Sequence, residues 1–133
     1  MVKDLAASTK FLQEKFGIGP FAKVEFNQGK AQYKGREVGF KMKAGIAKCG
    51  DIMFEVIEVI EGDIILADPA YLPPGGQGVH HIGFFVPDAE ALAAEFEKDG
   101  GKVLQRSWAA PGLMTIYLDT PRYAGMLVEL IQL

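Results

Sequence analysis

The sequence predicts an α+β fold made of two βαβββ modules, with helices outside mixed sheets and with the first strand of the first module absent. The main observation is an internal sequence repeat, in which Val2-Lys3-Asp4 aligns with Val86-Pro87-Asp88, 84 residues further along the chain. A second echo, with an offset of 74 residues, aligns Met53–Ile57 with Leu127–Ile131. Periods this long indicate duplicated supersecondary modules rather than the shorter units of a solenoid.

The first module is expected to start with a helix. Asp4 can cap a helix that runs to about Phe16, and Gly17 is expected to end it. The polar, glycine-containing segment Asn27–Arg36 is predicted to be a loop or hairpin tip. Three strands are predicted from their β-branched and aromatic residues; they are Ala22–Phe26, Val38–Lys48 and Ile52–Ile60.

The second module is expected to follow a linker rich in proline and glycine. The predicted division is therefore residues 1–62 for the N-terminal module, 63–78 for the linker and 79–133 for the C-terminal module. Asp88 is expected to cap a helix that ends near Asp99. The strands of this module are predicted at Val79–Val86, Lys102–Trp108, Leu113–Leu118 and Met126–Leu133.

The first copy of the repeat begins where its first strand should already be ending. The counterpart of His81, 84 residues earlier, would precede Met1, so we expect a strand and any ligand it carried to be missing. Three explanations stay open: a displaced or truncated start, a natural relative without a metal, or a partner chain that fills the gap. In each case the first module has an exposed sheet edge, and such edges favour association. We therefore expect a homodimer.

Composition excludes several kinds of partner. The net charge is -3 and no basic tract is present, so the sequence does not predict binding to nucleic acid or to an anionic membrane. No hydrophobic run is long enough to span a bilayer, and no signal-peptide pattern is found. The single cysteine, Cys49, cannot form an internal disulfide, which suits a reducing compartment. The predicted location is the cytoplasm.

Two glutamates take equivalent places in the repeat, and each has an apolar residue on both sides. Glu55 and Glu129 are thus expected to be buried, where an unpaired carboxylate is costly or takes up a proton. A shared divalent cation would stabilise both. Strand alternation places His81 on the opposite face from His80. One imidazole with two carboxylates favours Mn, Fe, Co, Ni or Zn over Ca.

Simpler interpretations of these residues stay open. Either glutamate could be a buried acid that hydrogen bonds to a tyrosine or serine, or it could reach solvent at a sheet edge. His80 is expected to be structural rather than a ligand. Glu58 follows the alternation of its strand and is expected to be a surface or rim acid.

Three passages of the chain resemble the vicinal-oxygen-chelate superfamily, which includes glyoxalase I, methylmalonyl-CoA epimerase, extradiol dioxygenases and bleomycin-resistance proteins. They are FLQEKFGIGPF (Phe11–Phe21), GVHHIGFFVPD (Gly78–Asp88) and YLDTPRYAGMLVELIQL (Tyr117–Leu133). The last two passages resemble the glyoxalase and epimerase branch most. The resemblance implies two curved sheets around a shared cleft, where a divalent metal binds between the first and last strands of both modules.

The resemblance also implies roles for individual residues. The metal ligands of the family fall on Glu55, His81 and Glu129, and Glu129 is also the candidate catalytic base. The fourth ligand would precede Met1, so the metal is expected to bind weakly or not at all.

Two kinds of function fit this pattern. The first is a glyoxalase-like metal-dependent lyase or isomerase, which removes a proton next to a carbonyl of a small-molecule substrate. Lactoylglutathione lyase and methylmalonyl-CoA epimerase are its models, since metal chelation acidifies such a C–H bond. The alternative is a non-catalytic protein of the same fold that binds a small molecule, as in resistance. A remnant that holds no metal is a third possibility.

Overall fold

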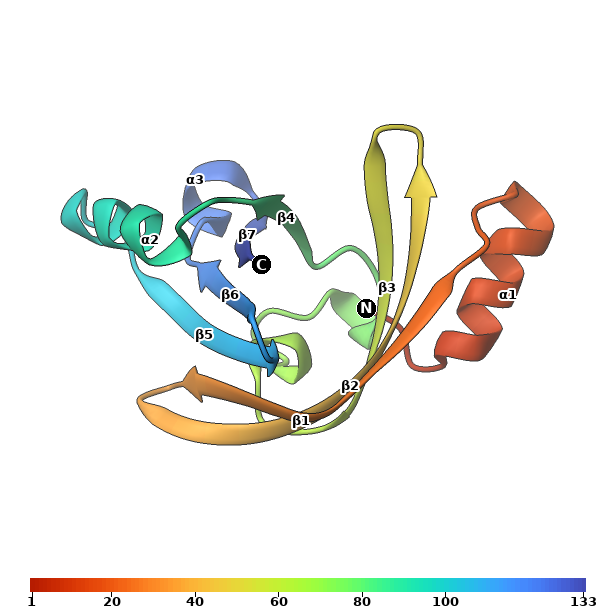
Figure 1. The fold of residues 1–133 in the computed structure, drawn as a ribbon, viewed down its shortest axis with the longest axis horizontal. Helices are drawn as coiled ribbons and strands as arrows, with labels where there is room; N and C mark the ends of the chain where they lie inside the picture. The colour runs from red at the N-terminus through yellow and green to blue at the C-terminus, as the bar shows by residue number, and fades with distance from the viewer.

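The protein is a seven-stranded sheet curled into a half-barrel, with helices on its outside (Figure 1). The computed structural model describes all of residues 1–133. The strand order is β3-β2-β1-β5-β6-β7-β4. Along the chain the elements are α1 (Leu5–Phe16), β1 (Ala22–Tyr33), β2 (Arg36–Cys49), β3 (Ile52–Glu61), β4 (His81–Phe85), α2 (Ala89–Lys98), β5 (Val103–Ala110), β6 (Leu113–Leu118), α3 (Pro121–Ala124) and β7 (Leu127–Gln132).

The α+β fold class is confirmed, and the topology shows how the two halves join. β1 pairs with β5, so the two halves form one continuous sheet. Outward from this junction the order β1-β2-β3 mirrors the order β5-β6-β7. β4 then pairs in parallel with β7, which makes the sheet mixed. The division of the chain at residues 62 and 78 stays a prediction.

The two edges of the sheet differ. β4 covers the outer side of β7, whereas β3 is itself an edge strand. The N-terminal residues lie beside β3 without forming a strand. Their contact with it is a hydrogen bond of 2.9 Å, in which the backbone N–H of Val2 donates to the carbonyl oxygen of Ile57. The last strand of the first half therefore has one paired side, and the last strand of the second half has two.

Both helix starts follow the predicted capping. The Asp4 carboxylate accepts a hydrogen bond from the backbone N–H of Ala7, and Asp88 does the same for Ala91. Glu58 has a role beyond that of a rim acid, because its carboxylate accepts from the N–H of Leu5 at 2.8 Å and so ties α1 to β3.

The segment Asn27–Arg36, predicted to be a loop or hairpin tip, does contain the hairpin turn, but most of it is strand. β1 continues to Tyr33, and the hairpin turns at Lys34 and Gly35 alone. The strand was hidden because a bulge follows Phe26 and because its inward positions are small or aromatic while its outward positions are polar. The inward position Gly29 lies against the Phe40 ring, where a Cβ would come within 2.4 Å.

The segment between the two halves fills the inside of the curl, where Figure 1 shows it crossing the middle of the molecule. Ile64 and Ile65 are fully buried in the larger core cluster, which also contains Tyr33 and Tyr117. The Gln105 side chain accepts from the N–H of Ile65 at 2.8 Å and so fixes this segment to β5. A smaller cluster lies between α2 and the sheet.

Candidate functional site

Sheet register brings His81 to Glu129. Glu129 on β7 lies between Tyr117 on β6 and Gly83 on the parallel strand β4. His81 precedes Gly83 by two residues and therefore projects from the same face. Its Nε2 lies 3.2 Å from Oε2 of Glu129, and both side chains are nearly buried, with 10% and 7% of their surface exposed. Two of the three predicted site residues are thus in contact.

Gly83 makes room for this carboxylate. A Cβ at Gly83 would lie 3.1 Å from Oε2 of Glu129 and 2.7 Å from Cδ1 of Ile131. A real side chain at this position would therefore displace the Glu129 carboxylate or the Ile131 side chain. The glycine explains why β4 can pack so closely beside an acid-bearing strand.

Glu55 is influenced by the charges of His81 and Glu129, but it is more exposed to solvent than either residue. The prediction that Glu55 is buried is wrong, since this residue is solvent-exposed on the edge strand β3. The protein that surrounds the carboxyl and the negative charge of Glu129 nevertheless raise the pKa of Glu55 to about 7. His81 and the amino group of Met1 act in the opposite direction and lower it.

The side chains of Glu55, His81 and Glu129 are of the kinds that bind a divalent cation, but they are not arranged around one point. One imidazole and two mutually repelling carboxylates are donors that a transition metal prefers. As the side chains stand, however, the structure contains no group of three His, Cys, Asp or Glu side chains arranged to hold a metal. It brings His81 and Glu129 together and leaves Glu55 apart from them. The ligand roles of Glu55, His81 and Glu129, and the catalytic role of Glu129, stay predictions.

His80 contacts His81, a contact that sequence reasoning missed. Nδ1 of His80 lies 3.0 Å from Nδ1 of His81, and the two rings meet edge to face. Alternation placed them on opposite faces, but β4 begins at His81, so His80 is not held to strand geometry. His80 is buried, and desolvation, followed by the charge of His81, lowers its pKa to about 4. At neutral pH His80 is therefore an uncharged imidazole.

Tyr117 forms the wall behind this group. Its ring lies edge-on to His81 with 5.3 Å between centroids. Burial, together with the nearby charge of Glu129, raises the pKa of the Tyr117 hydroxyl well above its ordinary value, so the hydroxyl stays protonated. An apolar, uncharged wall of this kind excludes water from one side of the His81–Glu129 pair.

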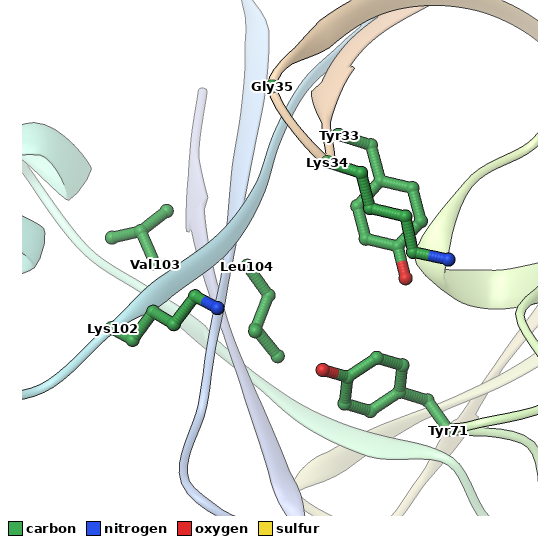
Figure 2. A pocket seen from close by; sticks show the side chains of 7 residues that line it. All are labelled: Tyr33, Lys34, Gly35, Tyr71, Lys102, Val103 and Leu104. Atoms are coloured by element: carbon green, nitrogen blue, oxygen red, sulfur yellow. The ribbon is translucent and has the colours of Figure 1, made fainter.

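A separate pocket of about 360 Å³ lies near the tip of the β1–β2 hairpin (Figure 2). Two lysines and two tyrosines contribute to it, among them Lys34 and Lys102. Lys34 is already paired with Asp68 at 2.6 Å. The lining includes none of Glu55, His81 and Glu129, so the pocket is not part of the candidate site.

Comparison with known proteins identifies the family. A sequence model of the glyoxalase/bleomycin resistance protein/dioxygenase superfamily matches residues 1–117. The chain belongs to this superfamily. No curated protein sequence matches the chain. None of its helices combines the length and hydrophobicity of a membrane-spanning segment.

Solved structures with the superfamily fold include several methylmalonyl-CoA epimerases. One, in complex with methylmalonyl-CoA and NH4+, is 24% identical, with a TM-score of 0.64 over 97% of this chain and 86% of that one. An epimerase from Streptomyces coelicolor, in complex with 2-nitronate-propionyl-CoA, gives the same values. The epimerase from Mycobacterium tuberculosis is 12% identical, with a TM-score of 0.63 over 98% of this chain and 81% of that one. These likenesses show a shared fold.

Proposed function

We propose that this protein is a metal-dependent isomerase or lyase that removes a proton from the carbon next to a carbonyl. The observation that carries the proposal is the nearly buried His81–Glu129 pair, 3.2 Å apart; the charges of both residues also act on the pKa of Glu55, the third donor. A carboxylate held against an imidazole beside an uncharged wall can accept a proton in a partly dry environment.

The site residues divide the chemistry between them. A divalent metal held by Glu55, His81 and Glu129 would polarise the substrate carbonyl and acidify the neighbouring C–H. Glu129 presents Oε2 to Nε2 of His81, and its carboxylate would receive the substrate proton. The contact with His81 holds the carboxylate in place, and the Tyr117 ring limits the access of water from behind.

We choose a 2-substituted acyl-CoA as the first substrate to test. The support for this choice is the fold shared with methylmalonyl-CoA epimerases, one of which is in complex with methylmalonyl-CoA. A glyoxalase-type reaction on the methylglyoxal–glutathione hemithioacetal is the second substrate to test, because it needs the same proton abstraction.

Solvent deuterium exchange tests the proposal directly. The protein, loaded with Mn, Co, Ni or Zn, is incubated with methylmalonyl-CoA in deuterated water, and label at C2 is followed by mass spectrometry. We expect exchange that a chelator abolishes and that Glu129→Gln slows by at least about 100-fold, the low end of what a general base contributes. Turnover of the hemithioacetal alone would assign the lyase activity. Absence of exchange and turnover with either compound, while the metal is bound, would overturn the enzyme assignment in favour of a non-catalytic binding protein.

We further propose that the protein forms a homodimer. Both edges of the sheet carry exposed apolar side chains, among them Ile52 and Ile60 on β3 and Phe84 and Phe85 on β4. Exposed edges with apolar residues are sites of association. Light scattering after size-exclusion chromatography should give twice the chain mass of 14.5 kDa; a particle of 14.5 kDa at micromolar concentration would contradict the dimer.

A further inference from the structure

The pocket near the tip of the β1–β2 hairpin is built from three segments that are far apart in the sequence. It is lined by residues 33–35 of the hairpin, by Tyr71 of the segment between the two halves, and by residues 102–104 around the start of β5 (Figure 2). We call it the hairpin pocket. Its volume of about 360 Å³ lies at the small end of the range for ligand-binding pockets, about 300–1,000 Å³. The pocket therefore fits a small molecule.

Asp68 fixes two of these three segments. Its buried carboxylate accepts a hydrogen bond from the Tyr33 hydroxyl at 2.6 Å and pairs with the Lys34 ammonium at 2.6 Å. Its backbone carbonyl oxygen accepts from the N–H of Tyr71 at 3.0 Å. A wall that is already ordered loses little conformational freedom when a ligand binds, so more of the contact energy appears as affinity.

The hairpin pocket carries one positive charge that no acid neutralises. The Asp68 carboxyl is ionised, because hydrogen bonds, first of all from Lys34, lower its pKa to about 2, and its charge balances that of Lys34. Lys102 takes part in none of the ion pairs of the structure. Asp119 donates its N–H to the carbonyl oxygen of Lys102 at 2.9 Å, but its carboxylate pairs with Arg122 at 3.5 Å. The Lys102 ammonium is therefore available to an anion.

The rest of the lining supplies a hydrogen-bond donor and an apolar surface. The Tyr71 hydroxyl takes part in none of the side-chain hydrogen bonds of the structure. Figure 2 shows this hydroxyl and the Lys102 side chain directed toward Leu104 from opposite sides. Leu104, Val103 and the Tyr33 ring form the apolar surface.

We propose that the hairpin pocket binds a small organic monoanion, whose carboxylate contacts Lys102 and the Tyr71 hydroxyl and whose apolar body packs against Leu104 and the Tyr33 ring. A cation would be repelled by the Lys102 ammonium, and a neutral molecule would leave that charge without a partner. A phosphate monoester carries about two negative charges; Lys102 balances one of them, and the Asp68 carboxylate repels the other.

This inference does not rest on the proposed function, because the lining includes none of Glu55, His81 and Glu129. Three probes of similar shape test it on the wild-type protein. Phenylacetate is the monoanion, phenylethanol its neutral analogue and phenylethylamine its cationic analogue. Each is titrated into ¹⁵N-labelled protein and followed in ¹H–¹⁵N correlation spectra.

We expect phenylacetate to cause saturable shifts in the three segments of the hairpin pocket. Phenylethanol should bind there at least about fivefold more weakly, because it lacks the ion pair with Lys102, and phenylethylamine should cause no shifts there. Equal affinity for phenylacetate and phenylethanol would overturn the inference, as would the absence of saturable phenylacetate shifts in these segments.

Two substitutions test the residues that hold the carboxylate. Lys102→Gln removes the charge and should weaken phenylacetate binding by about fivefold, the upper end for an exposed ion pair. Tyr71→Phe keeps the ring and should weaken it by about tenfold, the low end for a hydrogen bond to a charged group. The matched controls are Lys30→Gln and Tyr123→Phe, at an exposed lysine and an exposed tyrosine outside the pocket, and they should leave the affinity unchanged.

The spectrum of each variant shows whether it is folded, and if one is not, the three probes on wild type still decide. If folded Lys102→Gln and Tyr71→Phe both bind phenylacetate as tightly as the two controls, the carboxylate is not held by these residues and the inference is wrong.

Discussion

Glu55 and Glu129 occupy equivalent places in the two halves of the molecule, yet their environments differ. Glu129 lies on β7 between β6 and β4, and 6% of the residue is exposed. Glu55 lies on β3, which has β2 on one side and no strand on the other, and it is exposed. The same apolar sequence around each glutamate therefore does not fix its burial. The flanking strand does.

The flanking strand also provides the partner. β4 supplies His81 to Glu129 at 3.2 Å, and it supplies Gly83, which leaves space for the carboxylate. Glu55 has no contact of this kind from an adjacent strand. Although the residue is exposed, the protein around its carboxyl removes part of the solvent, and together with the repulsion from Glu129 this raises its pKa to about 7. The two halves thus contribute unequally to the site, and three experiments test that inequality.

The largest difference is expected in the reaction itself. Glu129→Gln should slow deuterium exchange by at least about 100-fold, because it removes both the base and a charged ligand. Glu55→Gln should slow it by about tenfold, because the amide oxygen can still act as a ligand and no base is lost. The measurement is the exchange rate of methylmalonyl-CoA at saturating metal. An equal loss in both variants would show that the two halves contribute equally.

A change at Gly83 tests the packing that only the second half possesses. Gly83→Ala should destabilise the protein by about 1–3 kcal/mol, because the new Cβ crowds Ile131 and Glu129. Gly39→Ala is the matched control, since a Cβ there meets nothing closer than 3.9 Å; it should change stability by less than about 0.5 kcal/mol. Urea unfolding of both variants measures the effect. A Gly83→Ala protein as stable as the control would show that β4 and β7 pack less closely.

The smallest effect is a pH dependence of stability that comes from Glu55. Its folded pKa of about 7 exceeds the ordinary value of 4.5, so folding disfavours the ionised form. In metal-free protein, wild type should match Glu55→Gln below about pH 4.5 and become less stable than it as the pH rises through about 7. Glu129, His81 and the Met1 amino group are the charges that act on Glu55.

The expected loss of stability is below about 1 kcal/mol, because solvent screens an exposed carboxyl. Urea unfolding of both proteins at about pH 4.5 and about pH 8, with a chelator present, measures it. If the difference in stability between wild type and Glu55→Gln is the same at both pH values, the pKa of Glu55 is not raised by folding and the prediction is wrong.

The sequence predicted the fold class correctly because the repeat is visible in local pattern. Aspartate caps, helix length and the alternation of strands are all local, and Asp4 and Asp88 cap their helices as expected. The extent of β1 was missed because its inward positions include Gly29 and Ala31, whose burial comes from the packing of Phe40 and other distant residues. A pattern of local hydrophobicity therefore does not predict such a strand.

The site was predictable only in part, for a similar reason. His81 and Glu129 could be singled out from their residue types and places in the strands, but the exposure of Glu55 depends on which strand lies beside β3. That is a property of the sheet, not of the segment. The contact between His80 and His81 could not be derived from alternation, since it depends on the strand starting at His81 rather than earlier.

Metal titration tests the central claim most directly, namely that Glu55, His81 and Glu129 form one site. Calorimetry with Mn, Co, Ni and Zn on wild type, Glu55→Gln, His81→Ala and Glu129→Gln should show a single site in wild type. We expect every variant to bind at least about tenfold more weakly, with Glu129→Gln weakened more than Glu55→Gln. Wild type that binds none of the four metals, or variants that bind as tightly as wild type, would contradict the account.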